Sequence, residues 1–513
     1  MSHSTVLSGQ FGVSRRAAGA ALILALTGCG TTVPLQSQTS ADGSNGVSDA
    51  TAAPGLVGAG TLAPGSGGSG PLPSGGSGSS RPPTTGQGSA PDGTYGARPA
   101  AGASNVPLMI GKPDTSPLTI GVLAAGDTQQ GAKTAGADSG TSTSAAAALK
   151  ALIRNFQATR LAGRPLKVVY KEVPVTTTNY ETELAADCAL FTQDNHVDLV
   201  LSDIGYYNKS LTACLDQAHV PQIEGGWGLT SDADFRSYAD YYTPGFPSYD
   251  FRFASVMSAG VSSGALKRGS HVGIVIEDCP QISGPAQSQL IPRAKAAGLT
   301  VVTSSVTCTQ GFQSAGQISQ QMQQAAFNFR AKGVQTVMFA TYPTGVDLVF
   351  FTQYASSQGY HPAYWLDSLA EVPVASAAGQ YPKDQYVNMK GTGWSTPMDQ
   401  SQFSLARPEQ KRCLQILRHQ GVSVTRPADY LLAESACDPF FLLEDALKIT
   451  RGHTDHLSLR QGIEELGSSF QSGVLTGATQ LRAGRHYGTA ELALFGYIAS
   501  CDCFRYSSTP RSW

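Results

Sequence analysis

The sequence predicts an α/β fold made of two similar lobes, each a parallel sheet flanked by helices. From about residue 118 onward, short apolar runs of strand length alternate with helical stretches, which is typical of successive βαβ units. The alternation occurs twice, and 194–202 and 331–340 fall at the same point of each series, where a helix ends and a buried strand begins. A duplicated lobe accounts for both observations.

The elements follow in chain order. Strands of the first series are expected at 118–124, 165–173, 197–202 and 220–224, and its helices at 143–161, 179–193 and 208–218. Strands of the second series are expected at 271–277, 300–306, 335–340 and 363–366, and its helices at 248–266, 284–297, 312–332 and 346–358. Helices then dominate at 407–420, 427–450 and 457–466, and the chain finishes with a strand-like segment at 490–498.

The first thirty residues have the pattern of an export signal. Arg15 and Arg16 precede an apolar run at 17–26. At about ten residues this run is too short to span a membrane, but it suits the hydrophobic region of a secretory signal. The signal, 1–28, ends in Leu-Thr-Gly before Cys29, which resembles a bacterial lipobox, where the cysteine is acylated with groups such as palmitate. An ordinary signal with an incidental cysteine is the alternative, and the paired arginines leave the general secretory and twin-arginine routes both open.

Residues 29–117 are predicted to form a disordered tether. Between 51 and 100 the chain has 14 Gly, 8 Pro and 7 Ser, with only three charged side chains. Such a stretch cannot bury enough apolar surface to offset the entropy lost on ordering it. We therefore expect a flexible spacer between the lipid anchor and the folded part.

Charge and motifs exclude several functions. The 35 Lys and Arg nearly balance 37 Asp and Glu, so no large positive field favours nucleic-acid binding. The chain has no phosphate-binding or dinucleotide-binding glycine motif and no recognisable triad, so we expect no cofactor and no catalytic residues. No Cys-x-x-Cys occurs, and His453-x-x-His456 has no cysteine nearby, so no metal site is expected. An exported hydrolase remains an alternative.

Eight cysteines remain once Cys29 is set aside, and an even number in an exported chain predicts disulfides. Eight cysteines allow 105 connectivities. Spacing and element order favour sequential pairing, because successive cysteines flank one strand or lie on consecutive elements. The expected pairs are Cys188 with Cys214, Cys279 with Cys308, Cys413 with Cys437, and Cys501 with Cys503, the last enclosing a single residue.

The order of these segments resembles the type I periplasmic-binding-protein fold. Within that fold it is most similar to the branched-chain amino-acid (leucine, isoleucine, valine) binding lipoproteins of ABC importers, over about 118–500. The resemblance implies three crossings between the lobes, near 244–247, near 373–383 and before the final strands. Lobe 1 would then comprise 118–246 plus about 383–485, and lobe 2 would comprise 247–382 plus about 486–513. Such lobes close over a ligand by a hinge motion.

Residues that follow the strands are the candidate ligand contacts, because open α/β sheets bind ligands outside the carboxyl ends of their strands. The set combines carboxylates and hydroxyls with aromatic rings that have an apolar face and a polar edge. Its members are Asp127, Ser202, Asp203, Tyr206, Tyr207, Gly226, Trp227, Tyr249, Glu277, Tyr342 and Asp367. The resemblance places α-carboxylate-binding loops at 202–205 and 225–228, and aromatic and acidic positions near Tyr342 and Asp367. Asp203 would repel an α-carboxylate, so a sugar, polyol or aromatic solute is expected as readily as an amino acid.

The resemblance also implies the partners. We expect an extracytoplasmic protein on the outer face of the cytoplasmic membrane, attached only through lipid, that passes a small molecule to the permease subunits of an ABC importer. It is expected to be a monomer. A ligand sensor or scaffold with the same fold and no transporter is the alternative.

Overall fold

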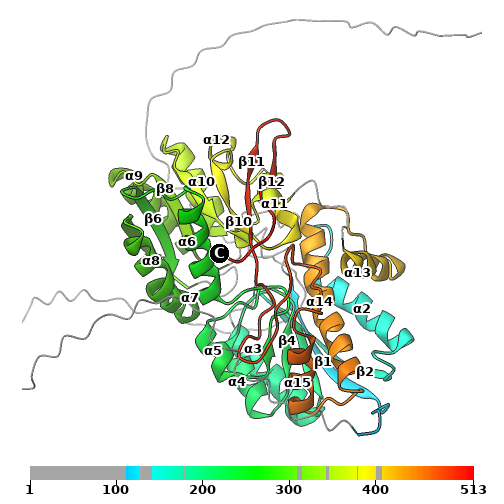
Figure 1. The fold of residues 1–513 in the computed structure, drawn as a ribbon. Helices are drawn as coiled ribbons and strands as arrows, with labels where there is room; N and C mark the ends of the chain where they lie inside the picture. The colour runs from blue at the N-terminus through cyan, green and yellow to red at the C-terminus, as the bar shows by residue number, and fades with distance from the viewer. Residues whose placement is uncertain are drawn as a thin grey trace, which may run out of the picture. The chain divides into compact units, whose positions relative to one another are not determined.

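A computed structural model of the chain describes residues 111–127, 129, 141–176, 179–308, 315–342, 346–377, 379–399 and 407–513 (Figure 1). The predicted signal, Cys29 and most of the predicted tether lie outside the described residues. The end of the predicted tether contacts the folded part. The Asp114 N–H donates to the Arg451 carbonyl (2.9 Å), and the Arg164 guanidinium donates to the Ser116 carbonyl (2.8 Å).

The first sheet has five parallel strands in the order β2-β1-β3-β4-β5. They are β1 (Leu118–Gly126), β2 (Leu166–Pro174), β3 (Leu199–Asp203), β4 (Gln222–Glu224) and β5 (Tyr241–Tyr242). Alternate residues of β1 enter two different apolar clusters, as the two-residue period of a strand requires. One cluster includes α2 (Ala145–Thr159), α13 (Pro408–His419), α14 (Pro427–Ile449) and α15 (His456–Leu466), and the other includes α3 (Tyr180–Ala189) and α4 (Lys209–Gln217).

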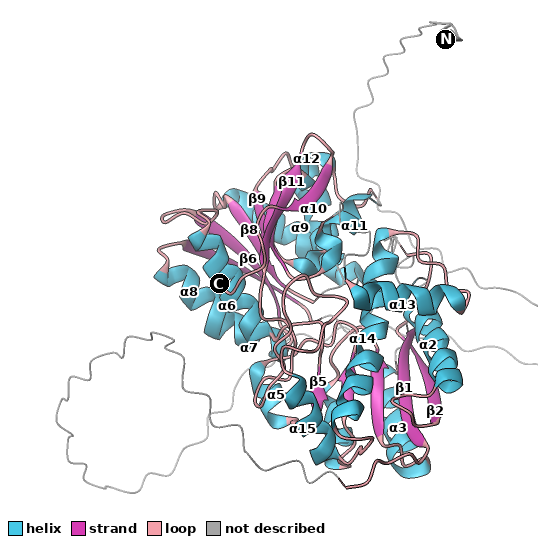
Figure 2. Ribbon diagram, turned by 45° about the vertical axis from the view of Figure 1, so that its right-hand side comes forward, coloured by secondary structure: helices cyan, strands magenta, loops and turns pink. Residues whose placement is uncertain are grey.

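The second sheet has seven strands in the order β12-β11-β10-β9-β8-β6-β7 (Figure 2). Its parallel strands are β6 (His271–Glu277), β7 (Thr300–Val306), β8 (Thr336–Ala340), β9 (Ala363–Leu366) and β10 (Met389–Gly393), and β11 (Ala493–Ile498) and β12 (Cys503–Tyr506) are antiparallel. One face packs on α9 (Ala315–Ala331) and α10 (Val346–Ser357). The other packs on α6 (Tyr249–Ser262), α7 (Pro280–Pro285) and α8 (Ile291–Ala296). The predicted class of two helix-flanked, mainly parallel sheets is confirmed.

The two sheets repeat one topology, because β7-β6-β8-β9-β10 matches β2-β1-β3-β4-β5 in chain order. A packing detail repeats as well. A Cβ at Gly121 in β1 would lie 2.8 Å from the ring of Phe191, and a Cβ at Gly273 in β6 would lie 2.7 Å from the ring of Phe329. In both lobes a glycine of the central strand therefore admits a phenylalanine from the second helical segment.

The return from the second sheet to the first begins after Gly393, whereas the sequence predicts a crossing near 373–383 and a boundary near 383. β10 belongs to the second sheet, where it pairs in parallel with β9. Its sequence, Met-Lys-Gly-Thr-Gly, lacks an apolar run. Gly391 is required by close packing, since a Cβ there would lie 1.9 Å from the carbonyl oxygen of Leu366. A strand rich in glycine gives no periodic signal.

The segments that cross between the sheets pair with one another. Thr243, after β5, forms a parallel bridge with Tyr487, and Ser395, after β10, forms an antiparallel bridge with Leu475. The first and second crossings are therefore each hydrogen-bonded to the last return of the chain. Two further short helices, α11 (Val372–Ala377) and α12 (Lys383–Tyr386), precede β10.

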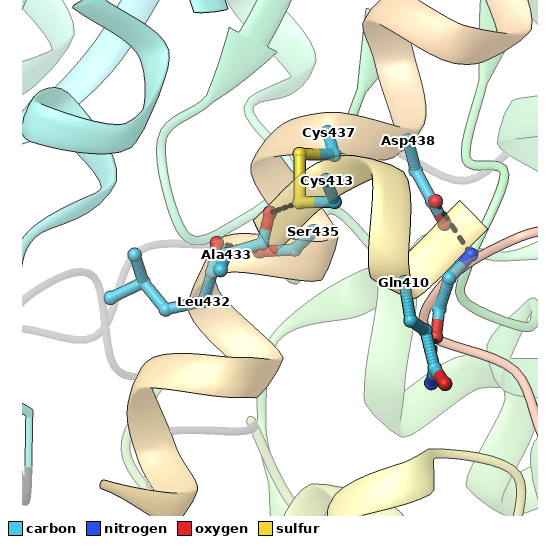
Figure 3. Close-up of a disulfide and its surroundings, with 8 residues drawn as sticks. Gln410, Cys413, Leu432, Ala433, Ser435, Cys437 and Asp438 are labelled. Carbon is cyan, nitrogen blue, oxygen red and sulfur yellow. Dashed lines mark hydrogen bonds between the residues drawn. A yellow bond between two sulfur atoms is a disulfide. The ribbon is translucent and has the colours of Figure 1, made fainter. Parts of the chain in front are cut away.

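Four disulfides are present, Cys188–Cys214, Cys279–Cys308, Cys413–Cys437 and Cys501–Cys503, and these are the four pairs expected from sequential pairing. Figure 3 shows the Cys413–Cys437 bond, which joins α13 to α14 next to Asp438. Among the helices of the described ranges, none combines the length and apolar character needed to cross a membrane.

Candidate functional site

The carboxyl ends of the parallel strands hold most of the candidate residues. In each sheet the strand order reverses beside the first strand, between β1 and β3 and between β6 and β8. Open α/β sheets bind ligands at such a switch point. Asp203 ends β3, Glu224 ends β4 and Glu277 ends β6. Each lobe therefore presents carboxyl groups where a ligand is expected.

Asp203 and Glu224 form a buried carboxyl pair in the first lobe. Their side chains surround Gly226, where a Cβ would lie 2.4 Å from Asp203 Oδ1 and 3.0 Å from Glu224 Oε1. Glu224 Oε1 accepts hydrogen bonds from the N–H groups of Ile204 (3.3 Å) and Gly226 (3.1 Å). Asp203 Oδ2 and Glu224 Oε2 are buried without a hydrogen-bond partner. Because unpaired buried oxygens cost free energy, the pair is suited to receive a further polar group.

Burial sets the protonation of this pair. It raises the pKa of Glu224 to about 7, against hydrogen bonds from the Ser202 side chain and nearby N–H groups. Burial and the neighbouring Glu224 charge raise the pKa of Asp203 well above its ordinary value. Two adjacent buried carboxyls do not both ionise readily, so both shifts favour a proton held by the pair. The pair can then donate one hydrogen bond and accept others.

The loop after β4 depends on its glycines. A Cβ at Gly225 would lie 2.2 Å from the carbonyl oxygen of Ser435 in α14. Pro439, inside α14, has no N–H, so the Ser435 carbonyl lacks the helical donor four residues on and is left to face the loop. Gly225 therefore allows the carboxyl pair to approach α14 closely.

Three aromatic residues connect the two lobes. The ring of Tyr206, after β3, lies edge-on to the ring of Tyr342, after β8, with centroids 5.8 Å apart. The Tyr342 hydroxyl donates to the carbonyl of Trp227 in the loop after β4 (3.3 Å). The Tyr206 hydroxyl is buried without a hydrogen-bond partner. These rings combine apolar faces with polar edges, which suits a sugar or an aromatic ring.

An internal ion pair occupies the second lobe. Arg252 of α6 is 2% exposed, and its Nε lies 2.6 Å from Asp367 Oδ2. Its other nitrogens donate to the carbonyls of Thr341 (3.1 Å) and Phe339 (3.3 Å). The protein itself therefore neutralises Asp367, which the sequence predicts to contact ligand directly.

A small pocket of about 20 Å³ lies beside this ion pair, and Arg252, Tyr342, Asp347 and Asp367 are among its lining residues. That volume holds about one water molecule, so it suits one functional group of a solute. Both carboxyl oxygens of Asp347 are buried without a hydrogen-bond partner. Burial, together with the charge of Glu277, raises the pKa of Asp347 well above its ordinary value. Glu277 Oε2 accepts a hydrogen bond from the Tyr342 N–H.

Two other candidates have structural roles: Ser202 supports the strands that carry the carboxyl pair, and Asp127 lies apart from the pair. The Ser202 hydroxyl accepts a hydrogen bond from the Gln222 side chain (3.0 Å), which ties β3 to β4. Asp127 is exposed and accepts from the Val175 N–H (2.8 Å), which fixes the chain after β2.

Tyr207 and Tyr249 are both buried. The Tyr207 ring packs against Tyr241, with centroids 5.4 Å apart, in a separate aromatic cluster. Tyr249 begins α6, and the Arg252 guanidinium lies 5.5 Å from the centre of its ring. Both hydroxyls are buried without a hydrogen-bond partner.

Glu224, Arg252 and Asp347 are site residues that the sequence analysis does not single out. The sequence predicts a strand that ends at Glu224 and gives no role to its side chain. Arg252 carries a usable signal, because it falls at helical spacing between Tyr249 and Val256, on a face that is expected to be buried and where a charge needs a partner. Asp347 sits in the first turn of α10, where an acidic residue usually needs no further explanation.

Comparison with known proteins rests on structure. No model of a protein family matches the chain, and no curated protein sequence is similar to it. The structure is similar to a possible leucine/isoleucine/valine-binding protein from Rhodopirellula baltica, with 13% identity, a TM-score of 0.56, and coverage of 78% of this chain and 98% of that one. A branched-chain amino-acid ABC transporter protein from Thermus thermophilus with bound valine gives 13% identity, a TM-score of 0.56, and coverage of 78% and 97%. An ABC transporter solute-binding protein from R. palustris in complex with 4-hydroxybenzoate gives 14% identity, a TM-score of 0.55, and coverage of 77% of this chain and 97% of that one.

The chain therefore has the two-lobed type I periplasmic-binding-protein fold, as the order of its elements predicts. Two of these structural neighbours are ABC transporter proteins, and the third is a possible leucine/isoleucine/valine-binding protein. At 10–16% identity the likeness concerns the fold, and the residues of the site have to be judged on their own contacts.

Proposed function

We propose that this chain is a lipid-anchored, extracytoplasmic solute-binding protein that captures a small molecule between its lobes and delivers it to an ABC importer. The observation that carries the proposal is a contact between residues at the carboxyl ends of the two sheets. Residues after β3 and β4 contact Tyr342 after β8, beside carboxyl groups that have unpaired buried oxygens. The lipobox-like segment at Cys29 supports the anchor, and the fold of the neighbours supports the link to an importer.

The chemistry of the site favours a hydroxyl-rich solute over an amino acid. A hydroxyl group can accept a hydrogen bond from protonated Asp203 and donate one to Glu224. Leucine, valine and 4-hydroxybenzoate each carry a carboxylate, which ionised Glu224 would repel and which Arg252 is not free to neutralise. We therefore propose a sugar, a polyol or a phenolic alcohol as the ligand class.

A thermal-shift screen of the mature chain tests both parts of the proposal. Matched sets of sugars, polyols, phenols, amino acids and aromatic carboxylates are compared, and hits are analysed for chemical turnover. A ligand at 100 times its dissociation constant adds about 2.7 kcal/mol of stability. Hits confined to carboxylates would contradict the ligand class only, whereas a complete absence of hits, or turnover, would contradict solute capture.

A further inference from the structure

The Cys501–Cys503 disulfide differs from the other three in what it joins. It lies at the tip of the β11–β12 hairpin and links cysteines 2 residues apart, whereas the other three link cysteines 24 to 29 apart. A disulfide stabilises mainly by closing a loop of the unfolded chain, and the effect grows with loop length. This bond therefore contributes little to holding the fold together.

The same disulfide is also the most accessible. Cys501 and Asp502 are exposed and Cys503 is half-buried. Each other pair has at least one fully buried cysteine, namely Cys188, Cys279, and both Cys413 and Cys437. Because exchange requires a thiolate to reach a disulfide sulfur, exposed disulfides are the ones that react. A thiol in solution or on another protein can approach this hairpin tip.

The turn between the two cysteines is held by contacts that do not need the disulfide. Asp502 has a φ of 49°, a conformation uncommon outside glycine. Its carboxylate lies 2.8 Å from Lys383 Nζ and accepts hydrogen bonds from the hydroxyls of Tyr497 (2.5 Å) and Tyr386 (3.1 Å). These contacts, with the Lys383 hydrogen bond the largest, lower the pKa of Asp502 to about 2, so it is ionised at neutral pH. The two cysteines therefore stay close together after reduction.

We propose that Cys501–Cys503 is a reversible thiol–disulfide exchange site for a dithiol partner. A thiolate of the partner bonds to Cys501 Sγ as the Cys501–Cys503 bond breaks, and Cys503 leaves as a thiolate that takes up a proton. The second partner thiol, as its thiolate, then closes the partner's own disulfide and releases Cys501, which is protonated in turn. Two electrons and two protons pass from the partner dithiol to this protein, and the reverse sequence restores the bond.

Graded reduction of the mature chain tests accessibility. The native protein is incubated with increasing dithiothreitol and alkylated with iodoacetamide, and the modified peptides are identified by mass spectrometry. Cys501 and Cys503 should be alkylated at a reductant concentration at least about tenfold below that required for any other pair. Reduction together with, or after, another pair would overturn the proposal.

Re-oxidation tests the preorganised turn. Asp502→Asn removes the charge that binds Lys383, and Asp194→Asn makes the same change at an exposed residue of the first lobe. After selective reduction, wild type and Asp194→Asn should re-form the bond in oxidised glutathione at equal rates. Asp502→Asn should be at least about fivefold slower. Equal rates in all three proteins would overturn the reversible site.

Discussion

Asp203 and Glu224 carry their chemistry because of where the chain buries them. Each ends a parallel strand, and each keeps one oxygen without a partner in a place that water does not reach. In the second lobe, by contrast, Arg252 saturates Asp367. Buried carboxyl oxygens without partners therefore lie in both lobes, at Asp203 and Glu224 in the first and at Asp347 in the second, whereas Asp367 is neutralised by Arg252.

The raised pKa of Glu224 predicts how stability depends on pH. A carboxyl with a folded pKa of about 7 and an ordinary value of 4.5 binds its proton more tightly in the folded protein. Its contribution to stability is therefore present below about pH 4.5 and is lost as pH rises toward 7. Glu224→Gln removes this loss. Its free energy of unfolding should therefore rise relative to that of wild type, by on the order of 1–3 kcal/mol, as the pH is raised from 5 to 8. Urea unfolding across that range measures it, and a constant difference between the two proteins would contradict the shift.

Trp227→Ala tests the aromatic contact. The indole packs against the apolar cluster that includes Tyr206 and Tyr342. Its loss should weaken the best ligand by at least about 1.4 kcal/mol, a tenfold change, as measured by titration calorimetry. Trp513→Ala is the matched control, since that indole packs near the C-terminus and donates to the Leu492 carbonyl. If both variants bind like wild type, Trp227 is not part of the site.

Sequence reasoning reached some residues of the site and missed others for a physical reason. Asp203, Trp227 and Tyr342 can be found from the sequence because each follows the end of a predicted strand within three residues. Arg252 was missed because its partner, Asp367, lies on another element far along the chain, and only the tertiary fold brings the two together.

At the scale of elements, strands with an apolar run were predicted nearly to the residue, and strands without one were missed. β6 and β7 lie at 271–277 and 300–306, as expected. β5 has two residues and β10 contains two glycines, so neither shows a two-residue period. The duplication could not supply the missing signal, because β5 and β10 are the corresponding fifth strands of the two lobes and both lack a period.

The repeated glycines in β1 and β6 give a prediction at the same scale. Gly121→Ala and Gly273→Ala force a methyl group against the buried rings of Phe191 and Phe329, and each should lower the free energy of unfolding by about 1–3 kcal/mol. Gly284→Ala is the control, because nothing lies within 4 Å of its added Cβ; since Gly284 lies in helix α7, the change should leave stability unchanged or raise it by up to about 1 kcal/mol. Urea unfolding measures the free energy of unfolding of each variant. Equal losses in all three variants would contradict the packing described.

For the whole molecule, the duplicated topology and the paired crossings suit the proposed capture of a solute. Each lobe has its own sheet and its own helices, and the crossings are joined through short bridges at Thr243 and Ser395. Domain closure of this kind turns about a few terminal residues of elements while the lobes stay rigid. The overall architecture could be predicted because it follows from the periodicity of apolar residues. The position of the second crossing depends on β10, which lacks such a period.

The most direct test is a crystal structure of the mature chain with the highest-affinity solute from the screen. The solute should lie between the two lobes, with a hydroxyl group within hydrogen-bond distance of Asp203 or Glu224 and a ring face against Tyr206 or Trp227. A solute bound outside the gap between β3 and β8, with the Asp203–Glu224 oxygens still unpaired, would contradict capture between the lobes.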